Sequence, residues 1–423
     1  TFDQNFKFLI PITIILIPAF LGIFYGLITL CFIISKPKKI VSSFFSFSLF
    51  FGIFEFIRGS ILTGFPWNLI AYSFSNHLEI LSITSFIGTY GFNLFCISLF
   101  TSPAVFILRD SKKDIWVCIV FLMMPLLFYM HGSSYKETFN TSDVISYNYK
   151  VRAIGSNISL DRFYSNIDPA SAINDLIEIS EPNKNEKTIF VWPEGILPEI
   201  SQKELFEYKW LFEKSFNKNH LLLIGINNQT INKESINYFN SLSIYDHNLE
   251  LLNFYNKVNL VPFGEFLPFE NISKAFGLRS ITNNYQSFSK GNKREIMEIN
   301  REGFSIKILP LICYEIIYSG KIFSNSNFDL IINISEDGWF GKSIGPKQHF
   351  AHSIFRAVES GKYLLRSANN GIAAIINPLG IVEQKIEYGE SGFIDFKEAK
   401  KIQPTLFSKY GNKIFIILIL LYI

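Results

Sequence analysis

The stretch "LPLICYEIIYSG", residues 309–320, ends an apolar run with a single cysteine, Cys313. Free cysteine is among the most buried residue types, so this run taken alone favours a thiol packed in a core. A nucleophilic thiol would also need a base, a cation for the negative charge that develops, and a reason to remain unpaired. The remainder of the sequence supplies the evidence for choosing between these two interpretations.

The composition indicates a membrane protein with a large globular part. Of the 423 residues, 48% are hydrophobic and only 18% are charged, whereas about a quarter of the residues of a soluble protein are charged. The net charge of +3 is too small to suggest a nucleic-acid partner. The length predicts two or three structural units.

Four apolar runs lie in the first third of the chain, and a bilayer core requires roughly 17 to 25 residues of helix. The runs are residues 8–35, 40–57, 80–108 and the shorter 115–130. After Met130 the sequence is mixed and polar, and it becomes apolar again near its end. The sequence therefore predicts a transmembrane helical domain, truncated at its N-terminus, then an extracytoplasmic catalytic domain and the start of a further transmembrane helix. The expected bounds are 1–131, 148–400 and 412–423.

Basic loops predict the orientation in the membrane. They lie between the first and second runs and between the third and fourth, and contain Lys36, Lys38, Lys39, Arg109, Lys112 and Lys113. Such loops usually remain in the cytoplasm. The loop "TGFPWN", residues 63–68, and everything after Met130 are therefore expected on the opposite side.

The globular part alternates between apolar strands and polar helices. We expect strands at 151–158, 188–192, 221–226, 240–245, 305–312, 330–334 and 373–376, and helices at 167–179, 202–216 and 349–363. This alternation is typical of a layered α/β domain. Glu194, Cys313 and the loop "SEDGWFG" (335–341) each follow a predicted strand, where α/β folds collect catalytic groups.

The motif "VWPEGILPE", residues 191–199, presents a candidate base. Pro193 restricts Trp192 to an extended conformation, so Glu194 is expected at the tip of a strand beside an indole. Apolar surroundings disfavour a charged carboxylate and make it a better proton acceptor, as a general base requires. The alternative is a glutamate exposed in a turn.

The motif "YNKVNLVPFGEFLPFE", residues 255–270, presents a candidate cation. Lys257 lies among apolar residues, where a fixed ammonium group would stabilise a developing oxyanion. Glu265 would hold this lysine or accept a hydrogen bond within the site. The alternative is a surface lysine whose aliphatic stem covers apolar surface.

Together with Glu194 and Lys257, Cys313 completes a set of nucleophile, base and cation, which is the minimal set for thioester chemistry. The other cysteines, Cys31, Cys96 and Cys118, fall in the apolar runs, so Cys313 has no disulfide partner in its own domain. The sequence has no G-x-S-x-G, H-E-x-x-H, C-x-x-C or P-loop motif. His349 and His352 have no neighbouring ligands to complete a metal site, so we expect no metal; a Cys–His pair remains open.

Seven motifs in order resemble the bacterial apolipoprotein N-acyltransferase family, over about residues 8–412. In the membrane part the match is "EFIRGSILTGFPWN" (55–68). In the globular part the matches are "WPE" (192–194), "YNKVNLVPFGEFLP" (255–268), "SFSKG" (287–291), "ICYEII" (312–317), "GWFGKSIGPKQHF" (338–350) and "LLRSANNG" (364–371).

The resemblance implies a nitrilase-like αββα sandwich inserted in an all-α transmembrane helical domain of the bacterial inner membrane. It implies Glu194 as base, Lys257 as oxyanion-stabilising cation and Cys313 as nucleophile. It gives supporting positions to Glu265, Glu315 and Tyr314.

The implied reaction moves an acyl chain from a phospholipid to a cysteine thioester. The chain then passes to the α-amine of the diacylglyceryl-cysteine of an apolipoprotein, in a ping-pong sequence without a cofactor. The expected protein is a monomer in the lipid bilayer with its catalytic domain in the periplasm. Expected substrate or lipid contacts are Trp192, Phe263, Trp339, Phe340, Pro66 and Trp67.

This chain departs from the family pattern at Glu336, and two alternative functions remain open. The family usually has Asn where this chain has Glu336 in "SEDGWFG". A membrane-anchored nitrilase-type amidase is one alternative, against which the loop "TGFPWN" between spanning helices argues. A non-catalytic lipoprotein-binding membrane protein is the other, and it would have no need of Glu194, Lys257 and Cys313 together.

Overall fold

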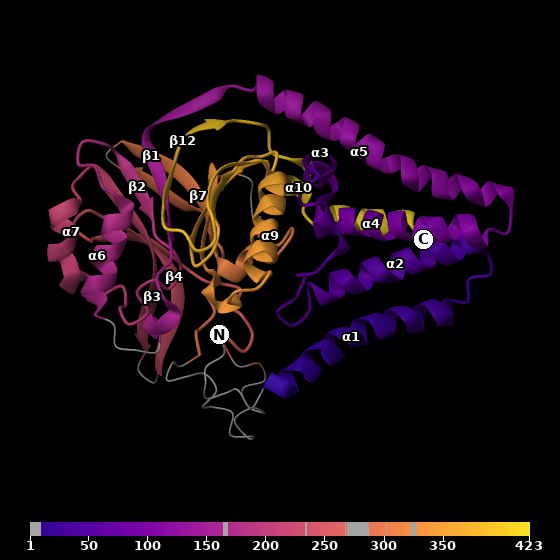
Figure 1. Ribbon diagram of the computed structural model, residues 1–423, viewed down its shortest axis with the longest axis horizontal. Helices are drawn as coiled ribbons and strands as arrows, with labels where there is room; N and C mark the ends of the chain where they lie inside the picture. The colour runs from indigo at the N-terminus through magenta and orange to yellow at the C-terminus, as the bar shows by residue number, and fades with distance from the viewer. Residues whose placement is uncertain are drawn as a thin grey trace.

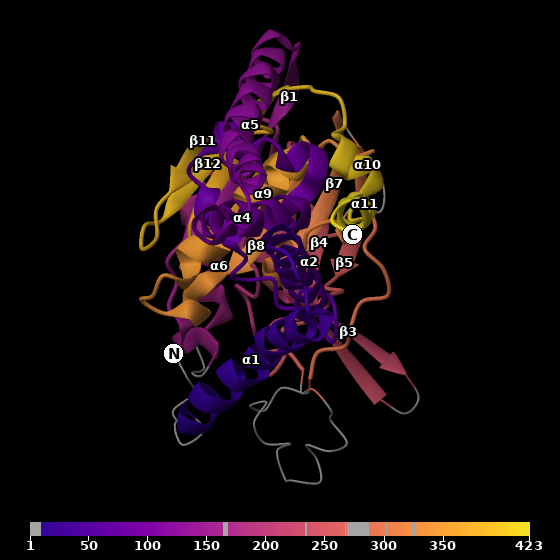
Figure 2. The same cartoon turned by 90° about the vertical axis from the view of Figure 1, so that its right-hand side faces the viewer.

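The computed structural model describes residues 10–163, 168–232, 235–266, 268, 287–301, 303–322 and 327–423. An α/β domain lies at one end of an elongated molecule, and a bundle of long helices extends from it (Figure 1). Helix α5 and helix α1 lie at opposite margins of this bundle in both views (Figures 1 and 2). The expected fold class, an α/β catalytic domain attached to a helical membrane domain, is confirmed.

Long apolar helices form the bundle. The helices in and around it are α1 (Ile10–Ser35), α2 (Ile40–Arg58), α3 (Leu78–Leu81), α4 (Thr84–Leu108), α5 (Ile115–Thr141), α10 (Leu406–Tyr410) and α11 (Lys413–Leu421). In the described part of the chain, four segments have the length and composition to cross a membrane: Ile14–Ser35, Ile40–Arg58, Thr84–Leu108 and Lys112–Thr141. They agree with the four apolar runs, although α5 continues beyond the expected end at Met130.

A kink in α4 shows how the bundle meets the globular domain. Gly88 has the left-handed φ of 71° inside the helix. A Cβ atom at this position would lie 2.0 Å from the ring of Phe407 in α10. Only glycine tolerates both the backbone angle and the close approach, so α4 bends tightly around this aromatic side chain.

The two kinds of membrane loop lie at opposite ends of the bundle (Figure 1). At the far end, the backbone N–H of Ile40 donates to Asp110 Oδ2 at 3.0 Å, which brings the two basic loops together. At the near end, Tyr314 Oη donates to the carbonyl oxygen of Gly64 at 2.9 Å. The loop of residues 63–68 therefore packs directly on the globular domain.

Twelve described strands form one sheet that is folded into two facing halves. The path is β5-β4-β3-β2-β1-β9-β8-β7-β6; off this path β10 pairs with β9, β11 pairs with β10, and β12 pairs with β1. The halves join where β1 pairs with β9 over only Gly155–Ala368 and Ser156–Asn369. The strands are β1 (Val144–Ser156), β2 (Thr188–Val191), β3 (His220–Asn232), β4 (Ser235–Asp246), β5 (Leu251–Asn256), β6 (Met297–Arg301), β7 (Phe304–Ile312), β8 (Leu330–Glu336), β9 (Tyr363–Asn369), β10 (Ala373–Ile376), β11 (Val382–Ile386) and β12 (Gly392–Lys400).

Alternating apolar residues hold the layers together. On β2, Ile189 and Val191 face the core between the two halves, whereas Phe190 faces α6 (Pro169–Ser180) and α7 (Lys209–Ser215). Side chains of a strand alternate between its faces, so strands β1 to β4 contribute to both cores. Helix α9 (Gly345–Ser360) lies between the second half and the bundle (Figure 1). The layers are thus α, β, β and α.

Five strands were not predicted: β5, β6, β9, β11 and β12. Strands β5 and β11 are mostly exposed and lack a clear apolar alternation. Strand β9 is buried throughout but carries Arg366, Ser367 and Asn369, which obscured its character. The helix expected at 349–363 ends instead at Ser360, because Gly361 adopts the left-handed φ of 66° as its C-cap.

Candidate active site

Three strand ends bring the predicted base, cation and nucleophile together. Glu194 follows β2, Lys257 follows β5, and Cys313 follows β7. Their exposed fractions are 6%, 1% and 8%, so all three lie below the surface. The charges of Glu194 and Lys257 both act on the Cys313 thiol.

The backbone of Cys313 makes a sharp turn. Ile312 is still extended, with φ −105° and ψ 114°, and Cys313 then adopts the left-handed φ of 48°. This conformation is uncommon for a residue with a side chain and is often found where a functional group must be presented. It begins a short 3-10 turn, Cys313–Ile317, at the end of β7.

The surroundings of the Cys313 thiol disfavour its thiolate form. Burial raises its pKa well above the ordinary range, and the carboxylate of Glu194 raises it further. The ammonium group of Lys257 lowers this pKa but does not reverse the effect. A thiol in this environment needs a base before it can attack, because the thiolate is the nucleophile.

Lys257 forms a buried ion pair with each of two carboxylates. Its Nζ lies 2.9 Å from Glu194 Oε1 and 2.9 Å from Glu265 Oε1. Burial by itself lowers the pKa of Lys257, but the two carboxylates raise it to well above the ordinary value. The lysine therefore stays charged at neutral pH, although it is almost completely enclosed.

Asn240 is a polar member of the site that the sequence did not single out. Its Nδ2 donates to Glu194 Oε1 at 2.7 Å and to Glu265 Oε1 at 2.8 Å. The other oxygen of Glu194, Oε2, accepts the backbone N–H of Glu336 at 3.0 Å. The only signal in the sequence was a polar residue at the start of the expected strand 240–245.

Glu315 ties the turn at Cys313 to the segment that follows Lys257. Its Oε2 accepts the Ile312 N–H at 2.9 Å, and its Oε1 accepts the N–H groups of Val258 at 2.9 Å and Asn259 at 3.0 Å. Arg294 Nη2 donates to Oε1 at 2.6 Å. Burial raises the pKa of Glu315, but Arg294 and the backbone donors bring it below the ordinary value.

Glu265 and Tyr314 connect the site to its surroundings. Glu265 Oε2 accepts the Val261 N–H at 2.8 Å, which closes the turn that follows Lys257. Tyr314 binds the Gly64 carbonyl, and Tyr318 Oη donates to the Thr63 carbonyl at 2.6 Å. The residues that follow Cys313 thus hold the loop of residues 63–68 in place.

A second buried cluster lies behind Cys313. His349 Nε2 lies 3.3 Å from the Cys313 carbonyl oxygen, and its Nδ1 lies 2.8 Å from Asp337 Oδ1. Arg366 Nη2 donates to Asp337 Oδ2 at 2.8 Å. The described contacts of the His349 ring nitrogens are thus with the backbone of the nucleophile, Asp337 and Arg366, which argues against the Cys–His pair left open above.

The six expected lipid contacts differ in accessibility. Phe263 is 65% exposed and Trp339 is 43% exposed, so both can meet a lipid. Trp67 and Phe340 are half-buried, with their ring centroids 5.4 Å apart, and Pro66 is buried.

The lipid contact expected for Trp192 is wrong. This side chain is fully buried, and its Nε1 donates to Ser180 Oγ at 3.0 Å in the core beneath α6. Trp192 lies two positions after Phe190, so both side chains point to the same face of the sheet, towards the helices. The chain then turns at Pro193 before it reaches Glu194. The surroundings of the Glu194 carboxylate are accordingly polar, because its described partners are Lys257, Asn240 and a backbone N–H.

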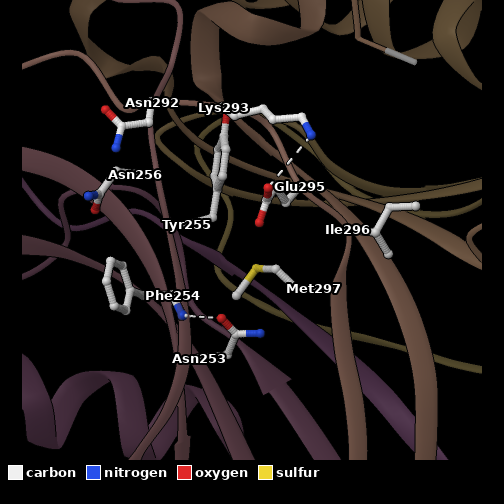
Figure 3. Close-up of a pocket in the computed structure, with 9 residues that line it drawn as sticks. All are labelled: Asn253, Phe254, Tyr255, Asn256, Asn292, Lys293, Glu295, Ile296 and Met297. Atoms are coloured by element: carbon white, nitrogen blue, oxygen red, sulfur yellow. Dashed lines mark hydrogen bonds and ion pairs between the residues drawn. The ribbon is translucent and has the colours of Figure 1, made fainter. Parts of the chain in front are cut away.

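A cavity of about 310 Å³ lies between β5 and the segment leading into β6 (Figure 3). Among the described residues, its lining includes none of Glu194, Lys257 and Cys313, although Tyr255 reaches from it to donate to Glu315 Oε1 at 2.7 Å. The lining is largely polar: Asn253, Phe254, Tyr255, Asn256, Asn292, Lys293, Glu295, Ile296 and Met297.

Known proteins are similar in sequence to this chain along almost its whole length. The apolipoprotein N-acyltransferase of Rickettsia bellii is 31% identical over 99% of this chain and 82% of the relative. That of Rickettsia prowazekii is 30% identical over 96% of this chain and 80% of the relative. This chain belongs to the apolipoprotein N-acyltransferase family.

Family models divide this acyltransferase chain in two. The model of the apolipoprotein N-acyltransferase N-terminal domain matches residues 2–100, and the carbon-nitrogen hydrolase model matches residues 176–395. The apolipoprotein N-acyltransferase of Rhodopseudomonas palustris is 28% identical over 97% of this chain and 77% of the relative. Among solved structures, this chain is similar to Saccharomyces cerevisiae Nit3, at 16% identity and a TM-score of 0.40, covering 59% of this chain and 90% of Nit3.

Proposed function

We propose that this N-acyltransferase moves an acyl chain from a phospholipid to the α-amine of the diacylglyceryl-cysteine at a lipoprotein N-terminus. The observation that carries this proposal is the burial of Cys313 beside Glu194 and Lys257, next to Tyr314, which binds the loop of residues 63–68 between the membrane helices. A thioester enzyme placed there has immediate access to a lipid ester.

In the first half-reaction Glu194 takes the proton of the Cys313 thiol, and Sγ attacks the ester carbonyl carbon. The resulting oxyanion lies near the Lys257 ammonium group, which stays charged because two carboxylates flank it. Collapse breaks the ester C–O bond, and Glu194 returns the proton to the glycerol oxygen. A lysophospholipid leaves, and the acyl chain remains as a thioester.

In the second half-reaction the α-amine of the lipoprotein attacks the thioester carbonyl. Glu194 accepts a proton from the attacking nitrogen, and Lys257 again faces the oxyanion. Cleavage of the C–S bond releases the N-acylated product, and the thiol recovers its proton from Glu194. The chemistry needs no group beyond these side chains.

We further propose a bacterial inner-membrane location with the catalytic domain in the periplasm. The basic loops lie at the end of the bundle that is remote from the site, as cytoplasmic loops would. Exposed Phe263 and Trp339 lie in loops adjoining the site and are suited to contact acyl chains.

Labelling of the enzyme by its donor tests this function. Full-length protein in detergent is incubated with a phospholipid that carries a radioactive acyl chain and is then treated with hydroxylamine. We expect a covalent label that hydroxylamine removes, and no label on Cys313→Ala. The matched control, Cys31→Ala, should be labelled as the parent is, because Cys31 lies in α1.

The labelled enzyme is then given a diacylglyceryl-cysteine peptide. The label should move to the peptide amine, as acyl transfer requires. An amidase would hydrolyse small amides without labelling from phospholipid, and a binding protein would acquire no covalent label. A label that survives in Cys313→Ala would remove Cys313 as the nucleophile.

A further inference from the structure

A buried ion pair between Arg162 and Glu336 joins separate loops at the edge of the sheet that carries Glu194. The side chains are only 2% and 1% exposed. Arg162 belongs to the turn Leu160–Phe163 that follows β1, and Glu336 is the last residue of β8. Neither residue has a place in the reaction described above.

Both oxygens of the Glu336 carboxylate accept hydrogen bonds. Oε2 accepts Arg162 Nη2 and also Asn369 Nδ2, the latter at 2.7 Å. Oε1 accepts the Gly338 N–H at 2.8 Å. The loops after β1, β8 and β9 are therefore tied to this one side chain.

Arg162 fixes its own loop in the same way. Its Nη1 donates to the carbonyl oxygens of Ser159 at 2.9 Å and Ile158 at 3.2 Å. A planar guanidinium group that binds a carboxylate and two backbone carbonyls allows little freedom to any of them. The pair consequently holds the backbone of Glu336 in one place.

That backbone binds the proposed base directly. The Glu336 N–H donates to Glu194 Oε2 at 3.0 Å, and it is the one hydrogen bond that the described residues give to this oxygen. The other oxygen, Oε1, is held by Lys257 and Asn240. Three donors from three segments thus define the plane of the carboxylate, and one of them depends on the ion pair.

We infer that Arg162 and Glu336 form a positioning pair for Glu194, acting through the Glu336 backbone N–H. Removing one partner leaves the other charge buried and unpaired, which is strongly unfavourable and must displace the loop. A displacement of about 1 Å at a reacting group can slow a reaction about 100-fold. The inference rests on the proposed role of Glu194 as base.

The experiment compares Arg162→Gln, Glu336→Gln and the double variant with the parent, as full-length proteins in detergent. The rate of hydroxylamine-sensitive thioester formation is measured at several phospholipid concentrations and expressed per folded enzyme. We expect each single variant to acylate about 10- to 100-fold more slowly at saturation, since geometry near the base is lost. The phospholipid concentration that gives half the maximal rate should not change.

The double variant distinguishes a coupled pair from two separate losses. With no charge left unpaired, it should recover to within about 5-fold of the parent, because coupled residues do not contribute additively. Arg152→Gln is the matched control: it breaks a bidentate ion pair between Arg152 and Asp395 on β1 and β12, and should acylate at the parent's rate.

The outcomes separate the two proposals. Single variants that acylate at the parent's rate would overturn the positioning role, as would a double variant slowed by the product of the single effects. A loss of folded protein without a slower rate per folded enzyme would show a purely structural pair and would also overturn it. A parent protein that takes no label would instead refute the proposed function.

Discussion

At the scale of single residues, the most informative group is the ammonium of Lys257. Enclosure removes water from it, and this would normally favour the neutral amine. Glu194 and Glu265 reverse that preference from 2.9 Å on each side. The ammonium group is thus fixed in place, as its proposed role in stabilising a transient oxyanion requires.

Lys257→Met should slow thioester formation by a factor of about 10² to 10³, the usual cost of losing one group that stabilises an oxyanion. Single-turnover labelling from phospholipid measures this rate. Lys257→Arg, which keeps the charge, should retain more activity than Lys257→Met. Equal rates in Lys257→Met and the parent would exclude the lysine from the chemistry.

At the scale of elements, the 3-10 turn Cys313–Ile317 depends on a single carboxylate. Glu315 accepts three backbone N–H groups, from Ile312, Val258 and Asn259. These donors belong to two separate segments. One segment leads into Cys313, and the other follows Lys257. Glu315 therefore caps the turn and ties it to the segment that follows Lys257.

This carboxylate predicts a dependence of stability on pH. The pKa of Glu315 is lower in the folded protein than its ordinary value, so its stabilising contribution is complete above the ordinary pKa and is lost as the pH falls towards the folded pKa. The melting temperature of the parent should exceed that of Glu315→Gln at neutral pH. The difference should shrink below about pH 4, near the ordinary pKa of glutamate. Thermal unfolding across this range measures it, and a difference that stays constant down to about pH 3 would contradict the account.

At the scale of the whole molecule, a buried ion pair within α9 joins the catalytic domain to the membrane helices through Thr89 of α4. Arg356 Nε lies 2.8 Å from Glu359 Oε2 in α9, with both side chains fully buried. Glu359 Oε1 accepts the Thr89 N–H of α4 at 2.7 Å, and Arg356 Nη2 donates to Thr89 Oγ1 at 2.6 Å. The two domains therefore share one polar junction beside the kink at Gly88.

Glu359→Gln should destabilise the full-length protein by about 3 to 5 kcal/mol, because it leaves the Arg356 charge buried without its carboxylate. Thermal or chemical unfolding in detergent measures the loss. The matched control is Glu213→Gln, which breaks the exposed pair with Lys209 and should change the free energy of unfolding by less than about 1 kcal/mol. Similar effects in both variants would show that the junction contributes little.

The elements that could be predicted from the sequence are those that a local pattern of residues determines. Apolar length identified the four membrane helices, and the run before Cys313 identified β7 because a strand buried on both faces is continuously apolar. Asn240 and Arg162 escaped prediction because their partners are distant: Arg162 and Glu336 lie 174 positions apart. Strand β5 escaped because an exposed edge carries no apolar alternation.

Trp192 shows the opposite error, in which a local pattern suggested too much. Trp192 and Glu194 are close together in the motif "WPE", which suggested that both side chains face the same surface. Pro193, however, turns the chain between them. The indole instead fills the core beside Phe212, with ring centroids 5.7 Å apart. Adjacent positions in a motif can therefore serve different layers of the fold.

Helix α5 has one further consequence. Its 27 residues, Ile115–Thr141, cover about 40 Å at 1.5 Å per residue, while the hydrocarbon core of a bilayer is about 30 Å thick. Only two residues separate its end from β1, so α5 leads directly into the catalytic domain with almost no intervening linker. The length of this helix therefore fixes how far the catalytic domain lies from the basic loops at the remote end of the bundle.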